Sequence, residues 1–398
     1  MDGHDGMSGD GPTMLIGEDW PEIRDSVARI CEPFDNDYWM QLDDASEYPT
    51  TFVQALTDAG YLATLIPEEY GGSGLPISAA CAVLETIHAA GGNAAACHAQ
   101  MYTMGTVLRH GSAEQKQKYL PGIATGELRM QAFGVTEPTT GSDTTQLKTR
   151  AVRDGNHYIV NGQKVWTSRA LQSDLMLLLA RTTPADEVKR RSDGVSVFLV
   201  DLREAVGNGV EIRKLDAAIN HNTCEVFIDN LKLTPDTLIG EEGRGFKYIL
   251  DGMNAERILI ASESIGDAKF FIKKSIDYAN DRVVFGSPIG KNQGIQFPIA
   301  RAYAEAQAAE MMVRKAAALF EQGLDCGAEA NMAKMLASEA AWKAAEACMQ
   351  THGGFAFAKE YGIERKWRET RLYQIAPIST NLILGYIGQH VLGMPRSY

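Results

Sequence analysis

The spacing of apolar and polar residues divides the chain into three parts. Up to about residue 130, stretches such as PTTFVQALTDAGYLATL and AACAVLETIHAAG carry apolar residues at helical spacing. From about residue 131 to 240, segments such as TRAVRDGNHYIVNGQKVWTS alternate polar residues with β-favouring ones. Long Ala-rich helical segments follow. The pattern predicts an α+β protein with an N-terminal helical domain (1–130), a small, mostly antiparallel β-domain (131–240) and a C-terminal helical bundle (241–398).

Turn signals within the central part support the prediction of strands there. Asp154-Gly155 and Asn161-Gly162 are pairs that favour tight turns between strands, so we expect a turn at each. Two other Gly-rich segments, 71–74 and 240–245, follow no parallel strand and contain neither a dinucleotide-binding fingerprint nor a phosphate-binding loop. We interpret them as connectors, so a nucleotide cofactor must bind to a different framework.

Composition narrows the classes of function. The chain has 398 residues, 45% of them hydrophobic, which is enough to bury a large core. It has no apolar run of about 18 residues and its first residues are acidic and Gly-rich, so we expect neither a membrane span nor an export signal. A net charge of -13 opposes binding to nucleic acid or anionic lipid. The six scattered cysteines, with no metal-ligand spacing, predict a cytoplasmic protein without a metal site.

Two polar segments of the predicted β-domain carry candidate chemistry. Residues 133–143 (FGVTEPTTGSD) and 163–168 (QKVWTS) place the hydroxyls of Thr136, Ser142 and Ser168, and the ring of Trp166, at the edge of one small sheet. This set suits a flat, hydrogen-bonding cofactor with an anionic tail. Taken singly, each segment is equally well a polar turn at a strand end, and a Trp in a strand is more often part of a core.

Three segments resemble signatures of the acyl-CoA dehydrogenase family. Residues 134–143 match its pattern of a small residue, an apolar residue, T-E-P, two residues and G-S-D. Residues 350–357 (QTHGGFAF) are similar to a second signature, with Ala356 in place of a glycine, and residues 282–289 (RVVFGSPI) are similar to a third. The three signatures agree with the helical, β, helical order of the chain. The resemblance implies an acyl-CoA dehydrogenase-like fold, FAD as cofactor and an acyl-CoA as substrate.

The resemblance also implies which residues bind the cofactor. It assigns FAD contacts to Phe133, Val135, Thr136, Gly141, Ser142, Trp166, Thr167, Ser168, Arg282, Phe285, Gln293, Gln350, Gly353, Gly354, Ser379 and Asn381. Within this set, the segments around Arg282 and Gln350 resemble positions that hold the adenine dinucleotide tail across a subunit interface. Such sharing implies a homotetramer built as a dimer of dimers. The alternative for Arg282 is a solvated cation at a helix end.

Family chemistry requires a carboxylate that takes the α-proton of the thioester in a dry pocket. The commoner family position for this base, near the C-terminus, is occupied here by Pro377. Glu256 matches the other position, which resembles that of the isovaleryl-CoA and long-chain acyl-CoA dehydrogenase branches. We therefore predict Glu256 as the base, although a helical Glu bonded to a neighbouring cation is an alternative. By resemblance, substrate contacts fall to Ser142, Met253, Asn254 and Arg257.

Pro377 raises a second question, because in relatives the backbone N–H at this position helps to polarise the thioester carbonyl. Proline has no N–H. Either Ala376 or Ile378 supplies the donor, or the carbonyl is activated in another way.

The resemblance implies a reaction as well as a fold. The predicted reaction converts an acyl-CoA to its trans-2-enoyl product in fatty acid or branched-chain acyl-CoA catabolism, with electrons passing to an electron-transfer flavoprotein. Alternatives are a desulfinase-like or oxidase reaction on the same fold, and a non-catalytic acyl-thioester binding protein. By resemblance, residues 96–101 border the acyl pocket, and a base in the central helix favours branched or longer acyl chains.

Overall fold

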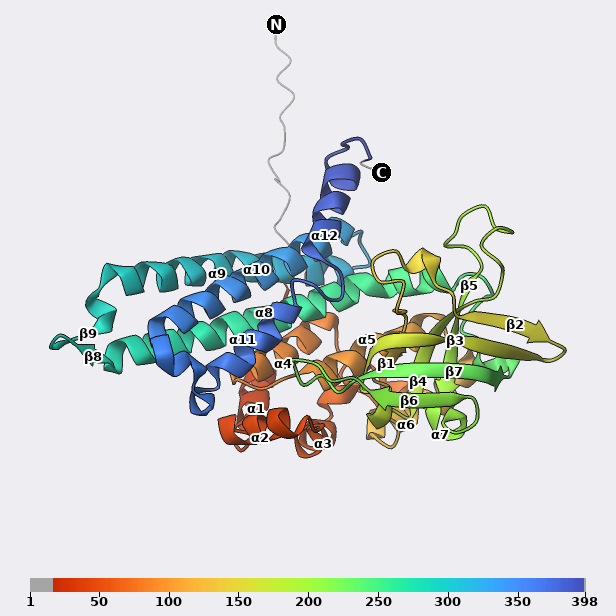
Figure 1. Ribbon diagram of the computed structural model, residues 1–398, viewed down its shortest axis with the longest axis horizontal. Helices are drawn as coiled ribbons and strands as arrows, with labels where there is room; N and C mark the ends of the chain where they lie inside the picture. Colours follow the sequence, from red (N-terminus) through yellow and green to blue (C-terminus); the bar gives the residue numbers. More distant parts are fainter. Residues whose placement is uncertain (1–16, 397–398) are drawn as a thin grey trace, which may run out of the picture.

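The computed structural model describes residues 17–396, with helices at one end of an elongated molecule and a sheet at the other (Figure 1). Helices form the N-terminal part: α1 (Pro21–Cys31), α2 (Asn36–Ala45), α3 (Thr50–Asp58), α4 (Ile77–Ala89), α5 (Ala95–His110) and α6 (Ala113–Thr125). Helix α4 is buried along most of its length, as its apolar sequence requires. Helix α6 begins at Ser112, which forms a capping box with Gln115.

The central part is one curled sheet. Its strands are β1 (Ala132–Gly134), β2 (Arg150–Asp154), β3 (His157–Ser168), β4 (Leu175–Arg181), β5 (Val195–Asp201), β6 (Val210–Lys214) and β7 (Thr223–Leu233), with the short helix α7 (Leu202–Ala205) after β5. The order is β1-β4-β2-β3-β7-β6, and β5 pairs with β4. Pairing is antiparallel except between β1 and β4 and at one residue pair between β2 and β4.

Strand β4 explains why part of the sheet reads as a continuous apolar run. All its residues are buried: Leu175, Leu177 and Leu179 pack into a core shared with helices α5 and α6. Met176 and Leu178 point to the opposite face, into a second core formed within the β-domain. A strand covered on both faces needs apolar side chains at every position.

The structure confirms one of the two expected turns and corrects the other. Asp154 ends β2 and His157 begins β3, so the turn at Gly155 joins two antiparallel strands. Asn161-Gly162, however, lies inside β3, where the pairing with β7 shifts register. Glycine is required there by a close approach, because a Cβ on Gly162 would lie 2.3 Å from the Thr149 hydroxyl oxygen. Long-range pairing overrides the local turn preference at this position.

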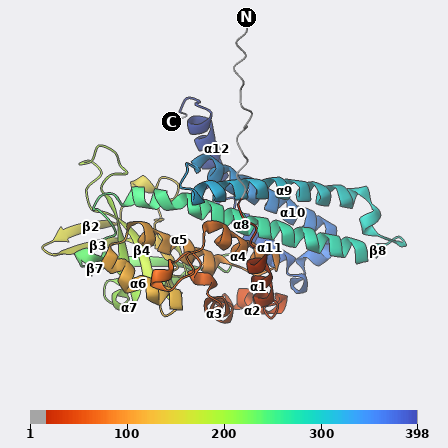
Figure 2. The same ribbon diagram turned by 180° about the vertical axis from the view of Figure 1, so that it is seen from behind.

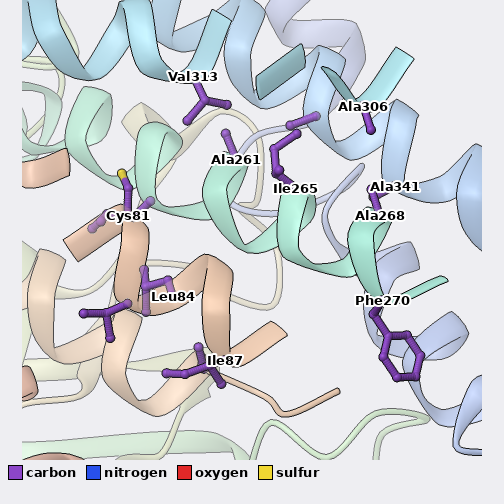
Figure 3. Packing of buried hydrophobic residues seen from close by; sticks show 14 of the residues in the cluster. Cys81, Leu84, Ile87, Ala261, Ile265, Ala268, Phe270, Ala306, Val313 and Ala341 are labelled. Atoms are coloured by element: carbon purple, nitrogen blue, oxygen red, sulfur yellow. The ribbon is translucent and has the colours of Figure 1, made fainter. Parts of the chain in front are cut away.

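The C-terminal part is a bundle around one long helix. Its elements are α8 (Gly245–Asp281), the hairpin β8 (Val283–Val284) and β9 (Ser287–Pro288), α9 (Gln293–Glu321), α10 (Gly327–His352), α11 (Ile363–Leu372) and α12 (Thr380–Tyr386). Helix α8 packs between α4 on one side and α9 and α10 on the other. Small residues such as Ala261, Ala306 and Ala341 are buried in the core between these helices and let the helices approach closely (Figure 3).

Helix α8 also sets the long dimension of the molecule. Its 37 residues span about 55 Å at the usual helical rise. One end lies beside the β-domain and the other carries the β8–β9 hairpin, as Figure 2 shows from behind. Among residues 17–396, no helix combines the length and apolar character needed to cross a membrane.

Candidate active site

The two polar segments of the β-domain meet in the structure. The Val165 N–H donates to the Thr136 carbonyl at 2.9 Å. Next to this bond, the fully buried Lys164 donates to Glu137 at 2.9 Å, and the Glu137 carboxylate also accepts from the backbone N–H groups of Lys148 and Thr149. Burial lowers the pKa of Lys164 to about 8, although Glu137 opposes the shift. Glu137 and Lys164 thus fix the loop against β3, a role that the sequence did not indicate.

Trp166 lies near the end of β3, next to the loop that Glu137 and Lys164 fix, and its side chain points to the surface. Strand β3 is irregular between Lys164 and Thr167, and Trp166 has a left-handed φ of 61°. Its side chain is 59% exposed, whereas Thr167 beside it is fully buried. Ser168, at the end of β3, is half-buried and contacts Thr223 at 3.5 Å between the two hydroxyl oxygens. An exposed indole beside hydroxyl groups offers a stacking surface for a planar ring.

The other residues assigned to the β-domain end lie along the same edge. Phe133, Val135 and Thr136 are half-buried, and Gly141 and Ser142 are exposed. The Phe133 ring meets Tyr102 of α5 edge-on, with ring centroids 5.6 Å apart. The edge of the sheet therefore borders α5 as well as open solvent.

The residues assigned to the cofactor tail gather at the opposite end of α8. Arg282 follows the last residue of α8, and its guanidinium lies 5.8 Å from the centre of the Phe355 ring. Fully exposed Phe285 occupies the tip of the β8–β9 hairpin (Figure 1). Also exposed at this end are Gln293, Gln350, Gly353 and Gly354. Within one subunit, the structure does not bring these residues to Trp166.

Glu256 lies about three turns into α8, at the end beside the β-domain. Its side chain is buried, and no described residue donates a hydrogen bond to its carboxylate. Burial raises the pKa of Glu256 above its ordinary value, against the opposing effects of His98 and Arg257. Arg257 donates instead to Asn254 at 2.9 Å and forms no ion pair with a described residue. The arrangement does not show the alternative of a Glu bonded to a neighbouring cation. Met253 and Asn254 are half-buried on the preceding turn.

The segment around Pro377 contains no carboxylate, and its backbone groups are unequally engaged. The Ala376 N–H donates to Leu372 at 2.9 Å, whereas the Ile378 N–H has no acceptor among the described residues. Buried Lys334 of α10 donates to the Ile378 carbonyl at 2.7 Å. Next along the chain, Ser379 accepts from the N–H of Leu382 at the start of α12, and Asn381 is exposed.

A buried polar network, centred on α8 about two to three turns after Glu256, was not predicted from the sequence. His98 of α5 and Glu263 of α8 approach to 3.0 Å, and His88 of α4 and Asp267 of α8 approach to 2.8 Å. Lys366 of α11 pairs with Asp267. Despite burial, interactions with His98 and with Lys366 lower the pKa values of Glu263 and Asp267, respectively, to about 2. Glu263 and Asp267 lie on α8, but their partners come from three other helices, so no single sequence motif indicates the network.

Comparisons with known proteins cover nearly the whole chain. Family models of the acyl-CoA dehydrogenase N-terminal, middle and C-terminal domains match residues 18–127, 132–231 and 243–392. The acyl-CoA dehydrogenase FadE12 of Mycobacterium tuberculosis (strain ATCC 25618 / H37Rv) is 34% identical over 389 residues, which are 97% of this chain and 99% of that protein. An acyl-CoA dehydrogenase of Bacillus subtilis is 35% identical over 356 residues, covering 88% of this chain and 92% of that protein.

A solved structure agrees with these relatives. The glutaryl-coenzyme A dehydrogenase in complex with glutaryl-CoA superposes with a TM-score of 0.87 at 30% identity, covering 94% of this chain and 95% of that chain. The exposed indole of Trp166 and the neighbouring hydroxyls fit a flavin, whose ring is planar and rich in hydrogen-bonding atoms. The chain therefore belongs to the acyl-CoA dehydrogenase family of FAD-dependent oxidoreductases.

Proposed function

We propose that this protein catalyses the α,β-dehydrogenation of an acyl-CoA to the trans-2-enoyl-CoA, with Glu256 as the α-proton base. The observation that carries the proposal is a buried carboxylate, free of hydrogen bonds from described residues, about three turns into α8 from the end that meets the β-domain. The C-terminal segment offers Pro377 and no rival carboxylate. A base in this environment is not already committed to another partner.

The surroundings of Glu256 suit proton abstraction from a weak carbon acid. Burial raises its pKa, so its carboxylate holds a proton more strongly than an exposed glutamate does. Bound FAD supplies the acceptor for the hydride that leaves the β-carbon. Trp166 and Ser168 are proposed to orient that ring, and Arg257, Asn254, Met253 and Ser142 are proposed to contact the substrate.

Polarisation of the thioester carbonyl is assigned to the Ile378 N–H. Of the two donors that flank Pro377, the Ala376 N–H is already bonded to Leu372, whereas that of Ile378 has no described acceptor. Lys334 donates a hydrogen bond to the carbonyl of Ile378 and so fixes this peptide segment. A fixed and unsatisfied N–H is what stabilisation of a developing oxyanion requires.

Electrons are proposed to pass on to an electron-transfer flavoprotein, and the enzyme is proposed to work in the cytoplasm. The six cysteines are all free and buried, which suits a reducing compartment. A desulfinase-like or oxidase reaction is the second candidate, favoured by the absence of a carboxylate at the C-terminal position.

Anaerobic titration with acyl-CoAs tests the proposed reaction. Purified protein should be yellow, with about one FAD per subunit, and acyl-CoA should bleach the flavin absorbance because the substrate reduces it. Adding an electron-transfer flavoprotein should restore the colour without oxygen. A desulfinase would turn over without net bleaching, and an oxidase would recover only in air. Colourless protein that cannot be reconstituted with FAD would contradict the proposal.

Assembly as a homotetramer, a dimer of dimers, is proposed from the placement of the tail residues. Arg282 and Phe285 lie at the end of α8 that carries the β8–β9 hairpin, away from the β-domain that carries Trp166, so they are assigned to the FAD of a neighbouring subunit. The exposed apolar side chains at this end and along the bundle, including Phe285, Phe297 and Phe357, suit an interface.

Arg282→Ala should weaken FAD retention by at least about tenfold, because a charge-assisted contact to the cofactor is lost. Retention is measured as the flavin-to-protein ratio after gel filtration, with light scattering for the oligomer. Arg29→Ala, at an exposed position of α1, is the matched control and should keep its FAD. A fully flavinated monomer of the unaltered protein would refute the shared site.

A further inference from the structure

One lysine of α10 is buried where the packing of the helix favours an apolar residue. Lys334 is fully buried, as are its neighbours on the same face, Ala330 and Ala337. The other fully buried lysines of the described chain, Lys164 and Lys366, pair with carboxylates, whereas no described carboxylate pairs with Lys334. A buried ammonium without an anion is unfavourable compared with an apolar side chain of similar size. Helix packing alone therefore does not explain Lys334.

The ammonium of Lys334 donates instead to a backbone carbonyl. Residues 373–379 join α11 to α12 and pass the N-terminal half of α10, where Lys334 Nζ donates to the Ile378 carbonyl at 2.7 Å. Burial lowers the pKa of Lys334 to about 8; Arg257 acts in the same direction and Glu339 opposes it. Most of this lysine is therefore charged at neutral pH, so its bond to Ile378 is charge-assisted.

Few other hydrogen bonds fix the segment around Ile378. Before it, the Ala376 N–H donates to the Leu372 carbonyl at 2.9 Å. Pro377 has no N–H to donate, and the Ile378 N–H has no acceptor in the part of the chain that the structure describes. Among the described residues, Lys334 therefore makes the one hydrogen bond that fixes the backbone of Ile378. The direction of the Ile378 N–H depends on that bond.

We infer that Lys334 is a positioning residue for the reaction: it holds Ile378 so that the free N–H meets the thioester oxygen when the α-proton leaves. The inference rests on the proposed function, in which Glu256 takes this proton and the thioester oxygen gains negative charge. A donor that is oriented before the reaction stabilises this charge better than one that must first reorient. Lys334 acts through Ile378 and is not assigned a contact with the substrate.

Replacing Lys334 by Met removes the donor and keeps a long, unbranched side chain. Lys334→Met should lower the limiting rate of flavin reduction by acyl-CoA about tenfold or more, because polarisation of the carbonyl is lost. The dissociation constant of the acyl-CoA should change by less than about threefold, because the bond acts on the transition state. Lys334→Gln, which can still donate, should recover part of the rate. Lys343→Met, which removes a surface pair with Glu305 on the same helix, is the matched control.

A substrate analogue separates positioning from a structural role. An acyl-CoA with sulfur in place of the β-carbon cannot be oxidised, but loss of its α-proton produces a long-wavelength absorption band with the oxidised flavin. At neutral pH, Lys334→Met should shift the equilibrium of the bound analogue about tenfold or more towards the protonated form, which is about one pKa unit, with FAD content unchanged. A lysine with only a structural role would lower FAD content or stability and leave this equilibrium unchanged in the flavin-loaded protein. That result would overturn the inference.

The unaltered protein provides a test that does not require the variants to fold. Raman difference spectra should show the carbonyl stretch of the bound enoyl-CoA product at a lower frequency than in solution, because the Ile378 N–H polarises this carbonyl. No shift would overturn the inference, as would equal rates of flavin reduction in Lys334→Met and Lys343→Met. If no acyl-CoA reduces the flavin of the unaltered protein, the proposed function itself is refuted instead.

Discussion

Glu256→Gln is expected to lower turnover by at least about 10²-fold while the protein keeps its FAD. The amide preserves the shape of the side chain but cannot take the α-proton. Its carboxylate is buried and receives no hydrogen bond from a described residue, so the substitution breaks no visible contact. Stopped-flow reduction of the flavin by acyl-CoA, under anaerobic conditions, isolates the step that should slow.

The pH dependence provides a second readout for the same residue. Because burial raises the pKa of Glu256, the fraction of ionised base should fall on the acid side at a pH above that of an ordinary glutamate. The rate of flavin reduction should therefore decrease at acid pH (the acid limb of its pH profile), and this decrease should be absent in Glu256→Gln. Arg257→Lys, on the same turn, is the milder control and should retain the limb. Flavin reduction at nearly the original rate in Glu256→Gln would remove Glu256 from the mechanism.

Lys366→Met is expected to lower the free energy of unfolding by about 3–5 kcal/mol, because it leaves a buried carboxylate without its cation. Lys366 and Asp267 are both fully buried and pair directly. Asp267 would keep only His88 and the Thr370 hydroxyl as partners. Urea denaturation followed by circular dichroism measures the change.

The control for this prediction is Lys273→Met, which removes an exposed pair with Asp277 and should have little effect. The pKa of Asp267 is lowered to about 2 in the folded protein, so its ionic contribution is present above about pH 4 and is lost as the pH falls towards 2. The difference between Lys366→Met and the unaltered protein should therefore shrink in acid. Equal denaturation midpoints for both variants at neutral pH would show that the buried pair contributes nothing.

The spacing of apolar residues predicted the order of helices and strands, because helices and strands bury their apolar side chains at different, recognisable intervals. The apolar run of β4 and the Ala-rich helices leave little choice of structure. Burial of Glu256 was likewise predictable, because Ile258, Leu259 and Ile260 follow it in a helix that is apolar around its circumference. Asn161-Gly162 failed as a turn because β7 pairs across it, and pairing with a distant strand is invisible to local propensity.

The buried polar network that follows Glu256 on α8 could not be predicted either, because it depends on contacts between distant segments of the chain. His88, His98 and Lys366 look like ordinary polar residues in their own helices. Only packing of four helices makes them neighbours of Glu263 and Asp267.

If the proposed assignments hold, the length of α8 makes one polypeptide serve two different catalytic centres. Glu256, in the first half of α8, is proposed to serve the site of its own subunit, while Arg282 at the end of α8 is assigned to the cofactor of a neighbour. A subunit defective at Glu256 still lends an intact Arg282, and a subunit defective at Arg282 still keeps an intact Glu256. In an oligomer assembled from both, complementation follows: the two damaged chains together compose one undamaged centre and one that carries both defects.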